Sequence, residues 1–384
     1  MMDDCGGRKR RIELGGRFSK RVMGGEIGAT DVILSTRELN RVIEYEPKDL
    51  TISVEAGMPF QALCDTLAAQ GQMLPIDPPF SNHATVGGVI ATNSSGPRRR
   101  RYGTARDMVI GMSMVTIGGK LVESGGMVVK NVTGLDIAKL MIGSYGTLTA
   151  IASVNFKVFP RPEVERTFLF GSAELAKILA LRRDLVEGHL QPVAMDLLNS
   201  EATHRMGIEV PAAYVLLVQV SGNEASASRY ERGYQRFAAN QKIEQFTAIP
   251  DTQAQVLWKA VQNLSYSLLS AEPRMAVLRI STTPTRLGEV FRLANDIAHE
   301  TPVLIRGGAA VGYLYCPNVK AAKIGLDMAV KSKLPAVIEA APPGEKTMLE
   351  QWHKPGNGID VMRRLKHRFD PDYLLNRGRL FNQI

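Results

Sequence analysis

Three glycine-rich segments lie in the first 150 residues, each beside an apolar run typical of a strand or a helix. They are ELGGRFSK (13–20), ATVGGVIATNSSG (84–96) and GSYGT (143–147). Glycine reaches positive φ and lets the backbone approach a ligand, so successive peptide N–H groups can form an anion-binding concavity. None of the segments matches the G-x-G-x-x-G or G-x-x-x-x-G-K-[ST] phosphate-binding patterns. One cluster alone indicates a turn. Three together make a nucleotide-type cofactor as good an interpretation as a set of turns.

The segments between these clusters predict the first domain. Residues 50–57 alternate apolar and polar side chains as a half-buried strand does, and residues 58–71 follow with helical periodicity. Residues 108–126 predict two short strands around a Gly118-Gly119 turn, and 133–146 predict a short helix. Residues 147–158 alternate again and end at Pro160 and Pro162. This proline pair predicts a domain boundary near residue 161.

The pattern changes after the boundary. Helix-like stretches at 173–188, 224–240 and 285–300 alternate with strand-like runs at 212–222, 274–282 and 334–341. This order favours an α+β domain in which helices pack on one antiparallel sheet. A chain of 384 residues is also too long for a single ordinary core, which again predicts two domains.

The net charge of +9 favours anionic partners without choosing among them. Arg98–Arg101 form the densest basic run, and only Tyr102 adds an aromatic side chain beside it, so nucleic-acid binding is disfavoured. Recruitment to a cofactor phosphate, contact with an acidic partner and a solvated charge run stay open for these arginines. Three widely spaced cysteines exclude a disulfide framework and predict a reducing compartment. No apolar run is long enough to span a bilayer.

Residues 31–79, 84–111 and 128–160 together resemble the FAD-binding domain of the vanillyl-alcohol oxidase/PCMH flavoprotein superfamily, and within it the FAD-binding subunit of bacterial glycolate oxidase. The ending RRLKHRFDPDYLLNRGRLF (363–381) is similar to the C-terminal signature of the same family. The resemblance implies a PCMH-type FAD-binding domain of two α/β subdomains over residues 1–161. It implies an FAD-linked oxidase C-terminal-like α+β domain over 162–384, in which 357–384 return to the flavin domain.

The same resemblance implies the residues that bind FAD. In the first loop, residues facing the diphosphate would be Gly15, Gly16, Arg17, Phe18, Ser19 and Lys20. Along the isoalloxazine and diphosphate would lie Thr85, Gly87, Gly88, Asn93 and Gly96. Closing over the adenosine or flavin would be Gly143, Gly146, Thr147 and Ile151, with Asn376 and Arg379 returning to the flavin side.

The chain departs from its relatives in three places. Only eleven residues precede Ile12, where relatives carry a helix and a strand, so we expect a shortened amino terminus. The superfamily attaches FAD covalently through a histidine or cysteine, and neither Gly16–Phe18 nor 91–93 offers one, so FAD should be noncovalent. Related 2-hydroxy-acid dehydrogenases carry a histidine-rich motif where residues 305–316 have none. We therefore expect no metal site.

The resemblance implies an FAD-binding subunit of a glycolate oxidase-type complex that passes electrons between a paralogous flavin subunit and an iron–sulfur subunit. A 2-hydroxy-acid substrate would need a cation for its carboxylate, for which Arg274, Arg279 and Arg306 are candidates. No catalytic base is evident. A self-sufficient FAD-dependent dehydrogenase of 2-hydroxy acids or alcohols and a degenerate structural subunit without FAD stay open as alternatives. We expect a cytoplasmic protein, with attachment to the inner membrane through partners left open.

Overall fold

The structure is a computed structural model that describes residues 1–128, 135–346, 351–352, 356–382 and 384. It divides the chain into two compact units, described separately below. The first comprises residues 1–95, 103–161 and 343–384, and the second comprises 96–102 and 162–342. The predicted boundary at 161 lies at this division. The returning segment begins at 343, earlier than the 357 implied by the resemblance, and the arginine run belongs to the second unit.

The elements of the first unit follow the periodicities of its sequence. Its strands are β1 (Ile12–Gly15), β2 (Val32–Ser35), β3 (Val42–Glu46), β4 (Thr51–Glu55), β5 (Gln72–Met73), β6 (Val109–Val115), β7 (Leu121–Gly125), β8 (Ala150–Lys157) and β9 (Phe159–Pro160). Its helices are α1 (Met2–Gly7), α2 (Phe60–Ala68), α3 (Val86–Ala91), α5 (Ala105–Met108), α6 (Ala138–Met141) and α13 (Gly358–Phe369), with a 3-10 turn at Pro47–Asp49. The predicted helix at 133–146 is only partly covered, because residues 133–134 lie outside the described part. Its described portion contains α6 alone.

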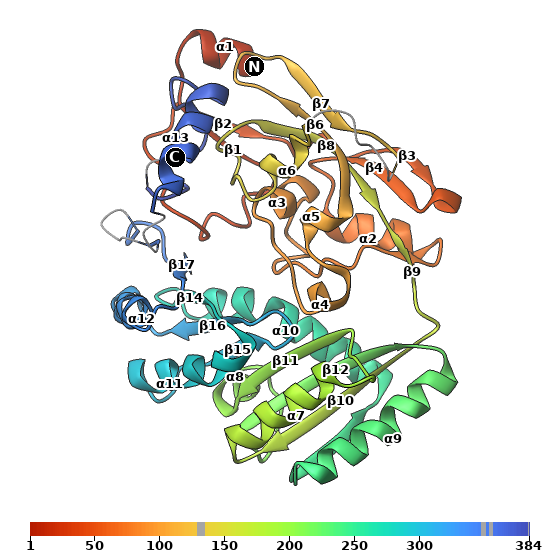
Figure 1. Ribbon diagram of the computed structural model, residues 1–384. Helices are drawn as coiled ribbons and strands as arrows, with labels where there is room; N and C mark the ends of the chain where they lie inside the picture. The colour runs from red at the N-terminus through yellow and green to blue at the C-terminus, as the bar shows by residue number, and fades with distance from the viewer. Residues whose placement is uncertain (129–134, 347–350, 353–355, 383) are drawn as a thin grey trace. The chain divides into compact units, whose positions relative to one another are not determined.

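Besides the short antiparallel pair of β5 and β9, two β-structures organise the described part of the first unit (Figure 1). In the described part of the chain, a five-stranded antiparallel sheet has the order β3-β4-β8-β6-β7, and β1 pairs with β2 in parallel. The alternation predicted for residues 147–158 is present in β8, where Val154 and Phe156 are fully buried. A parallel pair needs a long crossover between its strands. Residues 16–31 therefore form an extended loop rather than a hairpin, and this loop carries the first glycine cluster.

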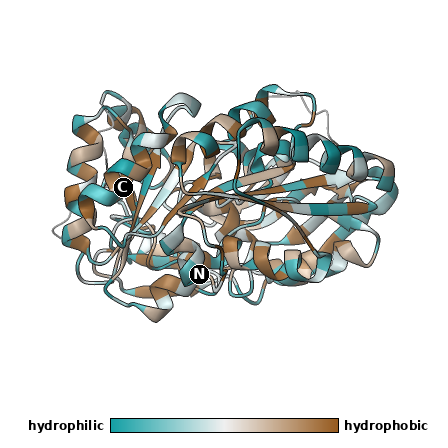
Figure 2. Ribbon diagram, turned by 90° about the horizontal axis from the view of Figure 1, so that it is seen from below, coloured by the Kyte–Doolittle hydropathy of each residue, from teal (hydrophilic) through white to brown (hydrophobic). Residues whose placement is uncertain are grey.

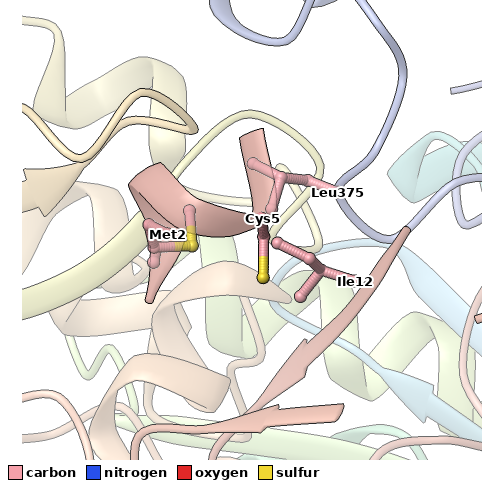
Figure 3. Packing of buried hydrophobic residues seen from close by; sticks show 5 residues of the cluster. Met2, Cys5, Ile12 and Leu375 are labelled. Atoms are coloured by element: carbon pink, nitrogen blue, oxygen red, sulfur yellow. The ribbon is translucent and has the colours of Figure 1, made fainter. Parts of the chain in front are cut away.

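The two ends of the chain pack together beside β1. Met2 and Cys5 of α1 form a buried cluster with Ile12, Ala150 and Leu375 (Figure 3). The backbone of Ile12 also bonds to the C-terminal segment, donating to Leu374 O at 2.8 Å. The short amino-terminal stretch is therefore folded onto the sheet.

A buried ion pair fixes the C-terminal segment. Lys366 Nζ lies 2.7 Å from Asp370 Oδ2 and also donates to the carbonyls of Thr147 (2.6 Å) and Leu375 (2.9 Å). Asp370 in turn accepts from the Leu375 amide at 2.7 Å. A buried carboxylate and ammonium are tolerated only when their hydrogen-bonding capacity is satisfied in this way. This network holds residues 374–379 against the glycine segment at 143–147.

The second unit contains an eight-stranded sheet, within the described part of the chain, whose neighbouring strands are all antiparallel, as predicted. The strands, given by position across the sheet, are β13 (Gln245–Ile249), β10 (Val164–Ser172), β12 (Tyr214–Gly222), β11 (Ala194–Asn199), β15 (Val303–Arg306), β16 (Val311–Cys316), β14 (Ala276–Ser281) and β17 (Ala336–Ala340). The helices are α4 (Arg99–Tyr102), α7 (Leu175–Glu187), α8 (Ser200–Arg205), α9 (Glu224–Asn240), α10 (Asp251–Ala271), α11 (Leu287–Ile297) and α12 (Val319–Lys331), with a 3-10 turn at Pro284–Arg286.

Helices cover both faces of this sheet. Phe168 and Phe170 of β10 make edge contacts with Tyr234 of α9, whereas Thr167, on the opposite face, accepts a hydrogen bond from Trp258 of α10 at 2.9 Å. Hydrophobic and hydrophilic residues are interspersed along the helix ribbons in Figure 2, the pattern of helices with one buried side. The sheet core is therefore closed by amphipathic helices.

Candidate cofactor site

A cavity of about 90 Å³ lies in the first unit where the three glycine segments meet. Of the predicted cofactor residues, those that line it are Gly15, Gly16, Arg17, Phe18, Ser19, Lys20, Thr85, Gly87, Gly88, Gly146, Ile151, Asn376 and Arg379. Sites for drug-sized ligands usually measure about 300–1,000 Å³. The enclosed part of this cavity has room for a diphosphate group.

Two of the glycines are required by close packing around this cavity. A Cβ at Gly16 would lie 2.2 Å from Thr85 Oγ1, so the first loop can approach the second segment only without a side chain there. Gly146 has a φ of +69°, and a Cβ there would lie 2.8 Å from Asn376 Nδ2. The glycines thus bring four stretches of backbone together, as well as leaving space for a ligand.

The amides of the first loop differ from those of the second segment. Within the described residues, the backbone N–H groups of Arg17–Lys20 donate no hydrogen bond. In contrast, the Gly87 amide donates to Ala56 O at 2.7 Å and the Gly88 amide to Thr85 Oγ1 at 3.3 Å. Unpaired backbone donors at a cavity need water or a ligand as acceptor. The first loop can therefore supply amide donors, whereas Gly87 and Gly88 supply only close approach.

Lys20 places a buried ammonium at this site. Its side chain is buried, it lines the cavity, and its Nζ has no hydrogen-bond partner among the described residues. Burial lowers the pKa of Lys20 to about 7. A buried ammonium without a partner is costly, so the site fits an anion that would accept from it.

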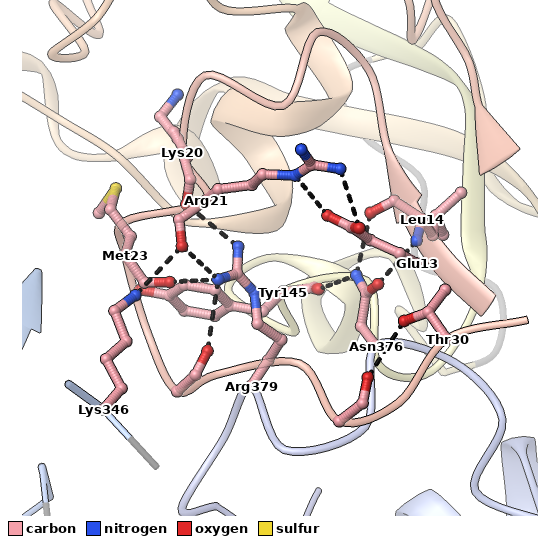
Figure 4. Close-up of polar contacts among 12 residues, drawn as sticks. Glu13, Leu14, Lys20, Arg21, Met23, Thr30, Tyr145, Lys346, Asn376 and Arg379 are labelled. Carbon is pink, nitrogen blue, oxygen red and sulfur yellow. Dashed lines mark hydrogen bonds and ion pairs between the residues drawn. The ribbon is translucent and has the colours of Figure 1, made fainter. Parts of the chain in front are cut away.

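Of the neighbouring charged residues, Arg21 and Glu13 are paired with each other. Arg21 forms a two-point ion pair with Glu13, with N–O distances of 2.6 and 2.9 Å, and its guanidinium lies 4.6 Å from the centre of the Phe18 ring. Both Arg21 and Glu13 line the cavity (Figure 4). This pair anchors the first loop to β1 and leaves Lys20 to meet a ligand charge.

Asn376 and Arg379 line the cavity, but the polar groups of their side chains form hydrogen bonds with the protein backbone. Asn376 exchanges two hydrogen bonds with the backbone of Leu14, at 2.7 and 3.1 Å, and donates to Tyr145 O at 2.7 Å. Arg379 donates to several carbonyls of the first loop (Figure 4). The C-terminal signature therefore shapes the site mainly by fixing the segments around it.

Four predicted cofactor residues do not line the cavity. Asn93 is exposed, and its amide and that of Gly143 both donate to Ile90 O, at 3.0 and 3.1 Å. Thr147 is fully buried, and its hydroxyl donates a hydrogen bond to Ser144 O at 2.7 Å. Gly96 belongs to the second unit. The contacts of Asn93, Gly143 and Thr147 in this structure are those of turn and packing residues, and their predicted contact with the cofactor stays a prediction.

The three candidate substrate arginines belong to the second unit. Arg306 is buried on β15 and paired with the buried carboxylate of Asp196 on the adjacent strand β11. Arg279 on β14 forms an ion pair with Glu339 at 3.1 Å, and Arg274 is exposed in the turn before β14. Arg306 and Arg279 are each paired with a carboxylate, whereas Arg274 is exposed and forms no ion pair among the described residues, so Arg274 is the best placed of the three to attract an anion from solvent.

Sequence reasoning missed several cavity residues, namely Glu13, Leu14, Arg21, Ile27, Thr36, Ala91, Thr92, Tyr145 and Thr149. Five of them lie inside the quoted glycine segments and could have been named from these, namely Glu13, Leu14, Ala91, Thr92 and Tyr145. The distant residues could not, because nothing local in a sequence shows which segments converge.

Two properties of the described residues concern other kinds of site. They contain no group of three or more histidine, cysteine, aspartate or glutamate side chains arranged to hold a metal ion. None of their helices is long and apolar enough to cross a membrane.

Comparison with protein families gives two matches. A model described as an FAD binding domain matches residues 2–125. A model described as the C-terminal domain of FAD linked oxidases matches residues 161–320 and 345–380.

Individual relatives agree with these matches. Glycolate oxidase subunit GlcD of Bacillus subtilis (strain 168) is 26% identical over 376 residues, covering 91% of this chain and 79% of GlcD. Glycolate oxidase subunit GlcE of Escherichia coli (strain K12) is 35% identical over 189 residues, covering 48% of this chain and 51% of GlcE. The solved structure of p-cresol methylhydroxylase (PCMH) with substrate bound superposes with a TM-score of 0.76 at 15% identity, covering all of this chain and 86% of that one. The predicted PCMH-type α+β fold is confirmed.

Proposed function

The chain belongs to the FAD-linked oxidases and is an FAD-dependent oxidoreductase, and on this basis we propose that it holds FAD noncovalently with the diphosphate in the cavity beside Lys20. The observation that carries this proposal is the buried Lys20 ammonium without a partner, next to the unpaired amides of Arg17–Lys20. Charge-assisted hydrogen bonds from such donors suit a dianionic diphosphate.

The lining of the cavity supports noncovalent binding. The described residues around it include no histidine or cysteine, the two side chains that the superfamily uses to attach FAD. The described cysteines lie elsewhere, two of them buried and one half-buried. A denatured sample should therefore release all of its flavin into the supernatant.

We infer that the substrate is a 2-hydroxy acid and that the chain acts within a glycolate oxidase-type complex. Two similarities support this inference, one to each of two different glycolate oxidase subunits. Bound FAD would supply the hydride acceptor for such an oxidation. The chain itself would supply cations for the carboxylate, of which Arg279 and Arg274 are the accessible candidates. An iron–sulfur subunit would take the electrons, and a cytoplasmic location, with membrane attachment only through partners, is part of this proposal.

The test has two stages. Titrating the purified chain with FAD, followed by flavin fluorescence, should give saturable one-to-one binding, and absence of binding would favour a structural subunit without FAD. Glycolate, D-lactate and D-2-hydroxyglutarate are then added anaerobically to the loaded chain, alone and with its co-purified partners. Bleaching of the flavin only with partners supports the subunit function, whereas bleaching of the lone chain favours a self-sufficient dehydrogenase.

A further inference from the structure

Arg379 reaches from the C-terminal segment to the backbone of the first loop. Its guanidinium is buried and donates to four carbonyl oxygens, those of Lys20 (3.0 Å), Arg21 (2.9 Å), Met23 (2.5 Å) and Gly25 (3.4 Å). These carbonyls lie within six consecutive residues. One side chain therefore sets the direction of most peptide groups that follow the glycine cluster.

Lys346 contacts the same stretch. It is almost fully buried, and its Nζ donates to the carbonyls of Arg21 at 3.1 Å and Val22 at 2.6 Å. Lys346 does not line the cavity, so it cannot touch a ligand there directly. Neither the sequence motifs nor the family resemblance assigns it a role.

The two cations lack the partners that usually justify their burial. Among the described residues, neither Arg379 nor Lys346 forms an ion pair with a carboxylate. The carboxylate that acts on Lys346 is that of Glu26, which instead accepts from the Gly344 amide at 2.9 Å. Buried charges held only by carbonyl dipoles are expensive. Their contribution must therefore lie in what they do to the loop.

The geometry shows what they do. In Figure 4 the Lys20 carbonyl points toward Arg379, whereas the Lys20 ammonium extends away from it. Holding the carbonyls of residues 20–25 on one side fixes the backbone from which the Lys20 side chain and the preceding amides face the cavity. The amides of Arg21 and Met23 complete the loop by donating to Phe18 O and Lys20 O, at 3.3 and 3.0 Å.

We propose that Lys346 and Arg379 are positioning residues: they clamp the carbonyl side of residues 20–25 and so preorganise the opposite side of the loop for a diphosphate. This inference rests on the proposed function for the identity of the ligand, but not for the clamp itself. Since both cations come from residues 343–384, the clamp also makes anion binding depend on docking of the C-terminal segment. Preorganised donors bind more tightly because less ordering remains to be done on binding.

Lys346→Met in the full-length chain tests the clamp, because it removes the donor without touching the cavity. Hydrogen exchange of the ligand-free protein, read by mass spectrometry, should show the amides of Arg21, Met23 and Gly25 exchanging about tenfold faster or more, with β6 unchanged. The Kd for FAD should rise by about tenfold or more, the value expected from one lost hydrogen bond to a charged group. Lys346→Arg should restore both readouts to within about threefold of the wild type.

Arg363→Met is the control, since it removes a partly exposed cation of α13 that forms an ion pair with Asp360 of the same helix. It should behave as the wild type. Weaker FAD binding with unchanged loop exchange would overturn the positioning role in favour of a long-range charge effect, and no change in either readout would overturn it outright. If Lys346→Met does not fold, Lys346→Gln is read in the same way. If the wild type binds no FAD, the proposed function fails, while the exchange data still decide the clamp.

Discussion

Replacing Lys20 by methionine should weaken FAD binding and, at the same time, stabilise the protein without ligand. Methionine keeps the length and the apolar stem of the side chain and removes only the ammonium. In the ligand-free fold that ammonium is buried and has no partner among the described residues. In the complex it would donate to the diphosphate. One substitution therefore has opposite effects on the two states.

The structure gives the size of both effects. A hydrogen bond to a charged group contributes about 1.5–3 kcal/mol, so the Kd for FAD should rise by about 10- to 150-fold. Burial lowers the pKa of Lys20 from 10.5 to about 7 in the folded chain. At about 1.4 kcal/mol per pH unit, this depression corresponds to a cost on the order of 3–5 kcal/mol near pH 7. The Lys20→Met variant should recover part of that cost.

The direction in which the free energy of unfolding changes with pH follows from proton binding at Lys20. The unfolded chain keeps the Lys20 proton up to its ordinary pKa, whereas the ligand-free fold releases it near pH 7. The free energy of unfolding of the wild type should therefore rise with pH between about 7 and 10.5, and the advantage of Lys20→Met should shrink over that range. FAD binding above pH 7 should take up a proton at Lys20, so calorimetry in buffers of different ionisation enthalpy should show about one proton fewer for the variant. Lys346, whose pKa burial also lowers to about 7, titrates in both proteins and cancels in this comparison.

Urea unfolding from pH 6.5 to 9.5 and FAD titration measure the two effects separately. Arg17→Met is the control, because Arg17 belongs to the same loop and lines the cavity but is exposed, so its charge should contribute about 1 kcal/mol or less. Equal FAD affinities for Lys20→Met and the wild type would refute the diphosphate site. Loss of stability in Lys20→Met would refute the assignment of an unpaired buried ammonium.

Three further substitutions test other parts of the structure. Gly16→Ala should displace the first loop, because its Cβ would lie 2.2 Å from Thr85 Oγ1, and should weaken FAD binding by about tenfold with little change in the melting of the second unit, measured by titration and calorimetry. Arg306→Met should destabilise the chain by about 3–5 kcal/mol in urea unfolding by removing the ion-pair partner of the buried Asp196 carboxylate, and adding Asp196→Asn should recover much of the loss. Lys366→Met should also cost about 3–5 kcal/mol, and an unchanged urea midpoint would show that the C-terminal network does not hold the segment.

Local sequence pattern predicted much of the fold. The alternation in residues 50–57 and 147–158 predicted the strands β4 and β8, and the helical spacing after Pro59 predicted α2, because period and capping are properties of neighbouring residues. The prediction that the first of these strands is half-buried was wrong, since all five residues of β4 are buried. The proline pair at 160 and 162 coincides with the division between the two units, because proline ends a strand locally. Residues 15–20, which the family resemblance implied as cofactor residues, line the cavity, and their contact with FAD stays a prediction.

What the sequence alone determined is therefore the chemistry of each segment: glycine-rich turns, their apolar supports and a lysine in the first loop. Only the tertiary structure decided which donors are spare. It satisfied the amides of Gly87 and Gly88 within the protein and left those of Arg17–Lys20 unpaired. It also brought Lys346 to the carbonyls of the first loop across more than 300 residues of chain. The physical reason is that the hydrogen-bond partner of a given group can lie anywhere along the chain, so whether that group is satisfied depends on the whole fold.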